Sequence, residues 1–394
     1  MDTKTKEQLE NTLMLYIHIP FCLRKCRYCD FLSFSSCTEK AMDSYTQALV
    51  REIAYYGSRT NMPVSSVFLG GGTPSLLPAG DLETIMEAIK EHFDLQADAE
   101  CTIEANPGTI TFDKAQIMKR IGINRVSIGV QTFNDRLLKT LGRIHTEKQA
   151  EESLGLFQNA GFDNLSVDLM PGLPGQTVQD VTDSICKAVS LGVTHLSCYS
   201  LIVEEGTEFY RLFQKGQLPL PDEDTERTMY HEAVKTLRSL GFERYEISNF
   251  SKPGFQSRHN SGYWMRRPYL GLGLGASSLY DETRWHNTQD LTEYNKLAQA
   301  DSVEISLKGI RRDVEKMTIK DQMEEFMFLG LRMDRGITYS DFKRLFKKDL
   351  YQVYGNAIEK HCQDGLLCKE EDRLHLTDRG VDLSNQVFVD FLID

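Results

Sequence analysis

The sequence LYIHIPFCLRKCRYC, from Leu15 to Cys29, passes from an apolar run into three cysteines. The run is typical of a buried β-strand, and the cysteines follow it at the spacing C-x3-C-x2-C. Three thiolates on a cubane of four irons leave one iron open, whereas tetrahedral zinc would need a fourth ligand from elsewhere in the chain. The spacing therefore favours a [4Fe–4S] cluster on Cys22, Cys26 and Cys29, with a zinc site or three packing cysteines as the alternative.

Basic residues alternate with these thiols. Arg24, Lys25 and Arg27 bring positive charge, which lowers the pKa of a thiol and offsets the negative charge of a cluster. The remaining cysteines have no comparable spacing and are expected to be ordinary buried residues. They are Cys37, Cys101, Cys186, Cys198, Cys362 and Cys368.

Apolar runs alternate with helix-period segments as far as residue 202. The expected strands are Leu13–Ile19, Val64–Leu69, Cys101–Ala105, Arg125–Val130, Leu165–Leu169 and His195–Leu201, with helices near residues 38–57, 79–92, 112–121, 147–160 and 179–191. This alternation predicts an α/β fold with a parallel sheet and right-handed crossovers. Six such units predict a partial (β/α)6 barrel, with ligands at the carboxyl ends of its strands.

The chain after Ile202 loses this rhythm. A polar helix near residues 222–240 and a glycine-rich run at 271–278 predict an extension that covers the barrel. From about Val303 the sequence predicts helices and then a hairpin at 365–377, which is typical of a small winged-helix-like domain. We expect a core barrel at 1–202, a cover at 203–302 and a C-terminal domain at 303–394. The last should pack or dimerise, because it lacks the basic face of a nucleic-acid binder.

The composition limits the partners and the cellular setting. The net charge of -12, from 57 acidic and 45 basic residues, disfavours binding to nucleic acid. The first dozen residues are polar and do not resemble a secretory signal, and the apolar runs are too short to span a bilayer. Nine cysteines, an odd number, argue against a disulfide framework. A cytoplasmic protein without an integral membrane segment is expected.

Polar residues recur at the ends of the predicted strands. Glu104, Gln131 and Asp168 end the third, fourth and fifth strands. Because the ends of parallel strands meet at one edge of a barrel, and a buried polar group needs a partner, these residues indicate a shared ligand site. The segment Gly70–Pro74 follows the second strand, where bare backbone can approach a ligand.

The cysteine spacing resembles the signature of the radical S-adenosylmethionine superfamily. The resemblance implies that the open iron binds the amine and carboxylate of S-adenosylmethionine, that the glycine segment meets the amine, and that Glu104 contacts the ribose. It also implies an electron donor for the cluster. The residues implied as cofactor contacts, some by position alone, are Tyr16, Tyr28, Gly71, Gly72, Thr73, Glu104, Gln131, Arg143, Asp168 and Ile202.

Longer segments resemble the oxygen-independent coproporphyrinogen oxidase-like subfamily. They are YIHIPFC at Tyr16–Cys22, the glycine segment, and MPGLPGQT at Met170–Thr177. The decarboxylating enzyme of that subfamily has a fourth cysteine where this chain has Phe31, and an extension before its first strand. Both departures favour the heme chaperones of the subfamily.

The segment HNSGYW, His259–Trp264, resembles the HNxxYW motif of those chaperones. The resemblance implies heme contacts at His259 and Tyr263 and delivery of heme to an acceptor protein, such as a membrane respiratory enzyme. Histidine is a common axial ligand of heme iron, and aromatic rings offer a flat apolar surface. A hydrogen-bonded core histidine is the alternative. Arg258, Arg266 and Arg267 could pair propionates, although solvated surface arginines are the simpler interpretation.

Two other functions stay open. The first is oxygen-independent decarboxylation of coproporphyrinogen III, which would make the protein a radical enzyme. The second is simple electron transfer, which leaves the polar residues at the strand ends without a role.

Overall fold

A twelve-stranded sheet is the framework of the molecule in the computed structural model, which describes residues 11–35 and 37–392. Six neighbouring strands are parallel and follow chain order: β1 (Leu13–Ile19), β4 (Val64–Gly71), β5 (Leu95–Ala105), β6 (Arg125–Gln131), β7 (Leu165–Leu169) and β8 (His195–Cys198). The sheet is open, because its two end strands, β14 (Arg311–Lys316) and β9 (Glu243–Glu246), do not pair with each other among the described residues. The predicted α/β class and partial barrel are confirmed.

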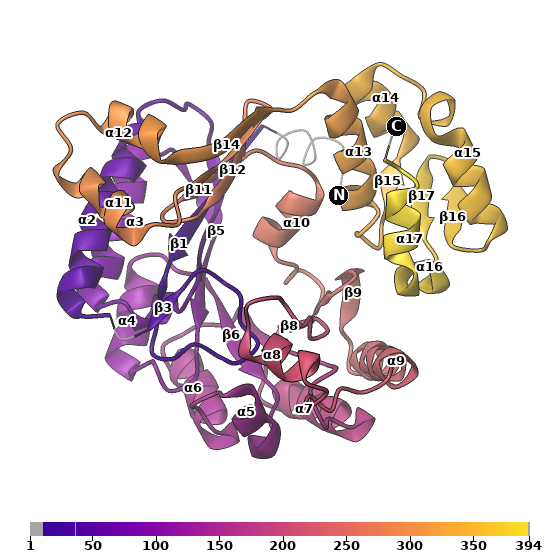
Figure 1. Cartoon of the computed structure of the whole chain (residues 1–394), viewed down its shortest axis with the longest axis horizontal. Helices are drawn as coiled ribbons and strands as arrows, with labels where there is room; N and C mark the ends of the chain where they lie inside the picture. The colour runs from indigo at the N-terminus through magenta and orange to yellow at the C-terminus, as the bar shows by residue number, and fades with distance from the viewer. Residues whose placement is uncertain (1–10, 36, 393–394) are drawn as a thin grey trace.

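Helices form the outer layer around these strands (Figure 1). They are α2 (Glu39–Gly57), α3 (Ala79–His92), α4 (Phe112–Arg120), α5 (Asp135–Leu141), α6 (Glu147–Asn159) and α7 (Val178–Ser190). Four begin after a threonine whose side-chain oxygen accepts a hydrogen bond from the first turn; these caps are Thr38, Thr111, Thr146 and Thr177. Apolar strand residues such as Val67 and Ile103 belong to the same core as the helix faces.

The other face of the sheet is polar, which sets the character of the barrel interior. Ser66, Ser127 and Ser166 alternate with apolar residues along their strands, and each hydroxyl is hydrogen-bonded to another inward side chain. Arg125 is 1% exposed and is the largest fully buried side chain. The barrel therefore has an apolar outer layer and a polar interior that can surround a polar ligand.

The last barrel strand is shorter than predicted. The sequence predicts a strand at His195–Leu201, whereas β8 ends at Cys198. Beyond it, the N–H groups of Tyr199 and Leu201 bond the carbonyl oxygens of Leu169 and Pro171 at 3.3 and 3.0 Å. The chain leaves the sheet here and runs beside the loop after β7, because its N–H groups bond the last carbonyl of β7 and then a loop carbonyl.

The extension continues the sheet at both ends. The predicted polar helix is α9 (Glu223–Ser239), and β10 (Asn249–Ser251) pairs antiparallel with β8 and β9. After α10 (Arg258–Trp264), β11 (Tyr269–Leu272) pairs parallel with β1, followed by β12 (Ser277–Tyr280) and β13 (Thr283–Asn287). The prediction of helix from about Val303 is wrong at Arg311–Lys316, which forms β14 on β13. Charged side chains are typical of an edge strand, and they leave no apolar run from which this strand could have been predicted.

The C-terminal part has an apolar core of its own, which includes Met327, Phe342 and Ile358. It contains α13 (Ile319–Gly330), α14 (Tyr339–Phe346), α15 (Leu350–Gln363) and a sheet of β15 (Ile337–Thr338), β16 (Leu367–Glu370) and β17 (Arg373–Leu376). Figure 1 shows it beside the barrel. The helical character and the hairpin match the prediction, while the boundaries at 202 and 302 stay predictions.

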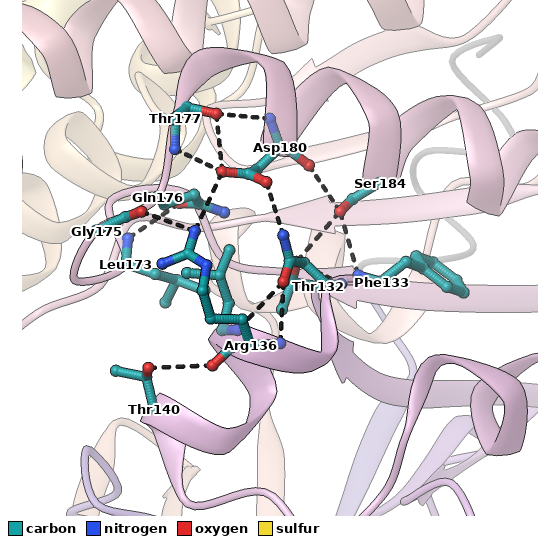
Figure 2. Close-up of polar contacts among 12 residues, drawn as sticks. Thr132, Phe133, Arg136, Thr140, Leu173, Gly175, Gln176, Thr177, Asp180 and Ser184 are labelled. Carbon is teal, nitrogen blue, oxygen red and sulfur yellow. Dashed lines mark hydrogen bonds and ion pairs between the residues drawn. The ribbon is translucent and has the colours of Figure 1, made fainter.

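The loops after β6 and β7 are fastened together by Asp180 (Figure 2). Its carboxylate accepts hydrogen bonds from the N–H and hydroxyl of Thr177 and from the side chain of Asn134. Arg136 donates to the carbonyl oxygen of Gly175 at 3.0 Å. These bonds hold the segment Met170–Thr177 against the start of α5, so both loops present fixed side chains to the space above the strands.

No helix among the described residues combines the length and the apolar character needed to cross a bilayer.

Candidate cofactor site

A cavity of about 300 Å³ lies at the carboxyl ends of the parallel strands. Most of the residues that the sequence singles out line it: Cys22, Cys26, Tyr28, Cys29, Gly71, Gly72, Thr73, Glu104, Gln131, Arg143, Asp168 and Ile202. Tyr16, His259 and Tyr263 do not. The ends of β4 to β7 and the loops after β1, α5 and β8 converge here, as expected for ligands in barrels of this kind.

Two of the three cysteines in the loop after β1 face side-chain hydrogen-bond donors. Thr73 Oγ1 lies 3.5 Å from Cys22 Sγ, and Arg143 Nη1 lies 3.5 Å from Cys26 Sγ. Donors and positive charge of this kind stabilise thiolates that bind a metal. Within the described part of the chain, no three His, Cys, Asp or Glu side chains are grouped to share one metal ion. A cubane spreads its thiolates over separate irons and so needs no such group.

Glu104, at the end of β5, is joined to the glycine loop after β4. Its Oε2 accepts a hydrogen bond of 2.9 Å from the N–H of Gly71. Burial, and next the negative charge of Asp168, raise the pKa of Glu104 to about 7. Gly71 has φ +108°, and a Cβ atom there would lie 2.4 Å from Cε1 of His18. Glycine is therefore required by the backbone and by the neighbouring imidazole.

Arg143 links the cysteine loop to two strand ends. Its Nη2 donates to Asn106 Oδ1 at 2.8 Å and to the carbonyl oxygen of Gly129. Asn106 in turn donates to Thr73 Oγ1 at 2.7 Å. Asn106 was not among the predicted site residues. Its position two residues beyond Glu104, just past the strand end, is the signal that could have identified it.

Gln131 enters the cavity through an irregularity in the sheet. The register between β6 and β7 shifts between Gly129 and Gln131, and Gln131 has φ +70°, which is uncommon for a residue with a side chain. Its Oε1 accepts a hydrogen bond of 3.2 Å from the hydroxyl of Tyr199. Tyr199 also lines the cavity and was missed, because the sequence placed it inside a strand.

Asp168 lies on the inward face of β7. Its Oδ1 accepts a hydrogen bond of 3.1 Å from Ser127 Oγ, and burial raises its pKa. Glu104 and Asp168 thus supply two carboxyl groups to the cavity wall. Burial favours the protonated form of both groups.

Tyr16 lies outside the cavity lining and contacts His18. Its hydroxyl is 3.0 Å from His18 Nδ1, and His18 Nε2 is 2.9 Å from the carbonyl oxygen of Leu32. This chain of contacts joins β1 to the far end of the cysteine loop. His18 was not predicted as a site residue, although its fixed spacing before the cysteines was visible in the sequence.

His259 and Tyr263 lie on α10, inside the barrel and away from the cavity. His259 is 1% exposed, and its Nδ1 and Nε2 lie 2.9 Å from Ser66 Oγ and 3.0 Å from the hydroxyl of Tyr263. The imidazole stacks on Phe68 with 5.1 Å between ring centroids. Burial lowers the pKa of His259 to about 3, so the ring is neutral at physiological pH. The predicted heme contacts at both residues stay predictions.

Two expectations about individual residues are wrong. Arg266 and Arg267 are not solvated: Arg267 is buried, and Arg266 forms ion pairs of 2.6 and 2.7 Å with Glu282 and Glu325. Arg258 is more exposed and pairs with Asp98 at 3.1 Å. Among the six cysteines expected to be buried, only Cys101 and Cys198 are. Cys37, Cys362 and Cys368 are half-buried, and Cys186 is exposed on α7.

Family models match two parts of the chain. Residues 16–185 match the radical SAM superfamily, and residues 317–383 match the HemN C-terminal domain. The fold is similar to that of coproporphyrinogen III oxidase (HemN) from Escherichia coli, with a TM-score of 0.83 and 22% identity over 100% of this chain and 93% of that one. The open barrel and its cavity thus define the radical SAM class of fold.

Relatives of similar length identify the family within this class. A protein named heme chaperone HemW from Lactococcus lactis is 38% identical over 379 residues, 96% of this chain and 97% of that protein. One of the same name from Bacillus subtilis is 39% identical over 380 residues, 96% of this chain and 98% of that protein. The chain belongs to the radical SAM superfamily and, within it, to the family of the heme chaperone HemW.

Proposed function

We propose that this protein is a heme chaperone of the cytoplasm that binds a [4Fe–4S] cluster, S-adenosylmethionine and heme, and passes heme to an acceptor protein. The acceptor is proposed to be a membrane respiratory enzyme, and an electron donor serves the cluster. The name shared by its relatives supports the heme function. The single observation that carries the cofactor assignment is the cavity, because three thiols and nine other predicted contact residues line it together.

Cys22, Cys26 and Cys29 would hold the cluster. The donor set fits, since Thr73 and Arg143 direct hydrogen bonds at two of the three thiols and Arg143 adds positive charge. When bound, the cluster supplies an open iron that chelates the amine and carboxylate of S-adenosylmethionine.

The remaining cavity residues would hold S-adenosylmethionine. The glycine loop at Gly71 and Gly72 offers bare backbone close to the cysteines, and Glu104 keeps that loop in place through the Gly71 N–H. The carboxyl groups of Glu104 and Asp168 provide hydrogen-bonding groups for the ribose. Tyr28, Thr73, Gln131, Arg143 and Ile202 complete the wall, and Tyr16 is assigned a positioning role through His18.

Heme binding is assigned to the segment around α10. His259 and Tyr263 are the residues that the motif predicts. For His259 to bind iron, its imidazole would have to give up the contacts to Ser66 and to the hydroxyl of Tyr263.

The alternative function is oxygen-independent coproporphyrinogen III dehydrogenation by radical decarboxylation, for which the shared fold is the specific argument. Phe31 argues against it. It stands where the decarboxylating enzyme has its fourth cysteine, and the residue is 64% exposed at the cavity.

An anaerobic assay on cluster-loaded protein separates the two functions. Incubation with S-adenosylmethionine, a reductant and coproporphyrinogen III should yield no decarboxylated porphyrin, while heme added in place of the substrate should bind. Decarboxylation together with formation of 5′-deoxyadenosine would favour the alternative.

A further inference from the structure

A second cavity, of about 440 Å³, lies between the barrel and the C-terminal part, on the other side of α10. Its size is within the range of small-molecule and cofactor sites. It is lined by two thioethers, Met265 and Met333, by the ring of Tyr245, and by arginines that include Arg258, Arg267 and Arg335. We propose that this cavity is the heme-binding site, with a methionine thioether as ligand to the iron. The proposal rests on the proposed heme function.

The two methionines come from different parts of the chain and both line the cavity. Met265 follows the last residue of α10 and is half-buried, with its Sδ 3.8 Å from Nη2 of Arg267. Met333 follows α13 and is 6% exposed, so the two sulfurs come from the barrel extension and from the C-terminal part. Methionine is a natural axial ligand of heme iron, and its flexible side chain adapts to a flat apolar ligand.

The arginines give the cavity a positive charge for a ligand with carboxylates. Arg244 forms an ion pair with Asp334 at 2.7 Å, and Arg258 forms one with Asp98 at 3.1 Å. Arg335 is half-buried, and among the described residues its side chain has no ion pair or hydrogen bond. Burial lowers the pKa of this guanidinium, and the negative charge of Asp341 opposes that effect. A heme propionate would add a directly bonded partner through a charge-assisted hydrogen bond.

The two faces of α10 separate this proposal from the histidine hypothesis. His259 points into the barrel toward Ser66 and Phe68, whereas Ser261 and Met265 line the cavity on the other side. A heme in this cavity can bind while His259 keeps both of its hydrogen bonds. It would also touch the barrel extension and the C-terminal part at once, because Met265 and Met333 come from the two sides.

The test is an anaerobic heme titration of the full-length, cluster-loaded protein, followed in the Soret band. The double variant Met265→Leu/Met333→Leu keeps the volume of both side chains and removes both sulfurs. We expect heme to bind at least about tenfold more weakly, and the near-infrared charge-transfer band of thioether-ligated ferric heme to disappear. Met229→Leu, in the barrel core on α9, is the matched control and should change neither.

A second pair of measurements tests the charge. Arg335→Gln should weaken binding of heme but not of heme dimethyl ester, whose propionates carry no charge. Unchanged heme affinity and spectrum in a double variant that melts like the wild type would overturn the site while leaving the chaperone function standing. Failure of the wild-type protein to bind heme at all would overturn both the proposed site and the chaperone function.

Discussion

Oε2 of Glu104 accepts a hydrogen bond of 2.9 Å from the backbone N–H of Gly71. This bond joins the ends of β4 and β5 directly beside the cysteine loop. Gly71 also lies against His18, which contacts the carbonyl oxygen of Leu32 beyond the last cysteine. The glycine loop, the carboxylate and the cysteine loop are thus held as one unit.

Replacement of Gly71 by valine should weaken S-adenosylmethionine binding and also lower the iron content of the reconstituted protein. The added Cβ would meet the His18 ring at 2.4 Å, and the backbone there has φ +108°, so the change strains the loop and displaces His18 from Leu32. Equilibrium dialysis and iron analysis measure the two effects. Gly80→Ala is the control, because a Cβ there meets nothing within 4 Å. Wild-type affinity in the valine variant would refute the assignment of the loop.

Simultaneous replacement of Cys22, Cys26 and Cys29 by alanine should abolish the brown chromophore of the cluster. Three of the cluster's four irons would lose their protein ligand. The matched control replaces Cys186, Cys362 and Cys368, which lie on α7, on α15 and in β16, and it should retain the cluster. Four irons per chain in the first variant would show that other residues bind them.

Glu52 should make the stability of the protein fall as the pH rises. Its buried carboxyl group accepts hydrogen bonds from Tyr294 and Gly273, yet burial raises its pKa from 4.5 to about 7. The folded state therefore binds more protons than the unfolded state between these pH values. Across that window the free energy of unfolding should decrease, by about 3 kcal/mol at most for this group.

Urea unfolding of Glu52→Gln at a series of pH values tests this dependence. The variant should show a flatter pH profile than the wild type, whereas the exposed Glu87→Gln on α3 should not change the profile. Parallel profiles for wild type and Glu52→Gln would mean that Glu52 has an ordinary pKa.

His259→Ala should lower the melting temperature and leave the Soret band of the folded fraction unchanged. The substitution removes two buried hydrogen bonds and the stacking on Phe68, a loss of about 2 to 4 kcal/mol. Because the proposed heme cavity lies on the other face of α10, the heme spectrum should survive. A shifted or absent Soret band in well-folded protein would instead support His259 as the iron ligand and contradict the thioether site.

Local patterns in the sequence sufficed to predict the barrel and most of its cavity. Apolar runs that alternate with helix-period segments predicted the six parallel strands. Because strand ends converge, Glu104, Gln131 and Asp168 could be predicted to meet. The bulge that turns Gln131 inward and the departure of the chain at Cys198 depend on hydrogen bonds to neighbouring loops, so neither was visible locally.

Contacts between distant segments were the part that the sequence did not reveal. Arg266 looked like a surface residue because its partners, Glu282 and Glu325, lie on β12–β13 and α13. Met265 and Met333 had no local signature, because their relation depends on how the C-terminal part packs beside α10. Such long-range contacts arise from tertiary packing and produce no periodic pattern in the sequence.

The heme-chaperone account is tested most directly by an anaerobic titration of the cluster-loaded full-length protein with heme, followed by mixing with coproporphyrinogen III, S-adenosylmethionine and a reductant. The account predicts a saturable Soret shift that reports heme binding and no decarboxylated porphyrin. A protein that binds no heme and decarboxylates coproporphyrinogen III with release of 5′-deoxyadenosine would contradict it.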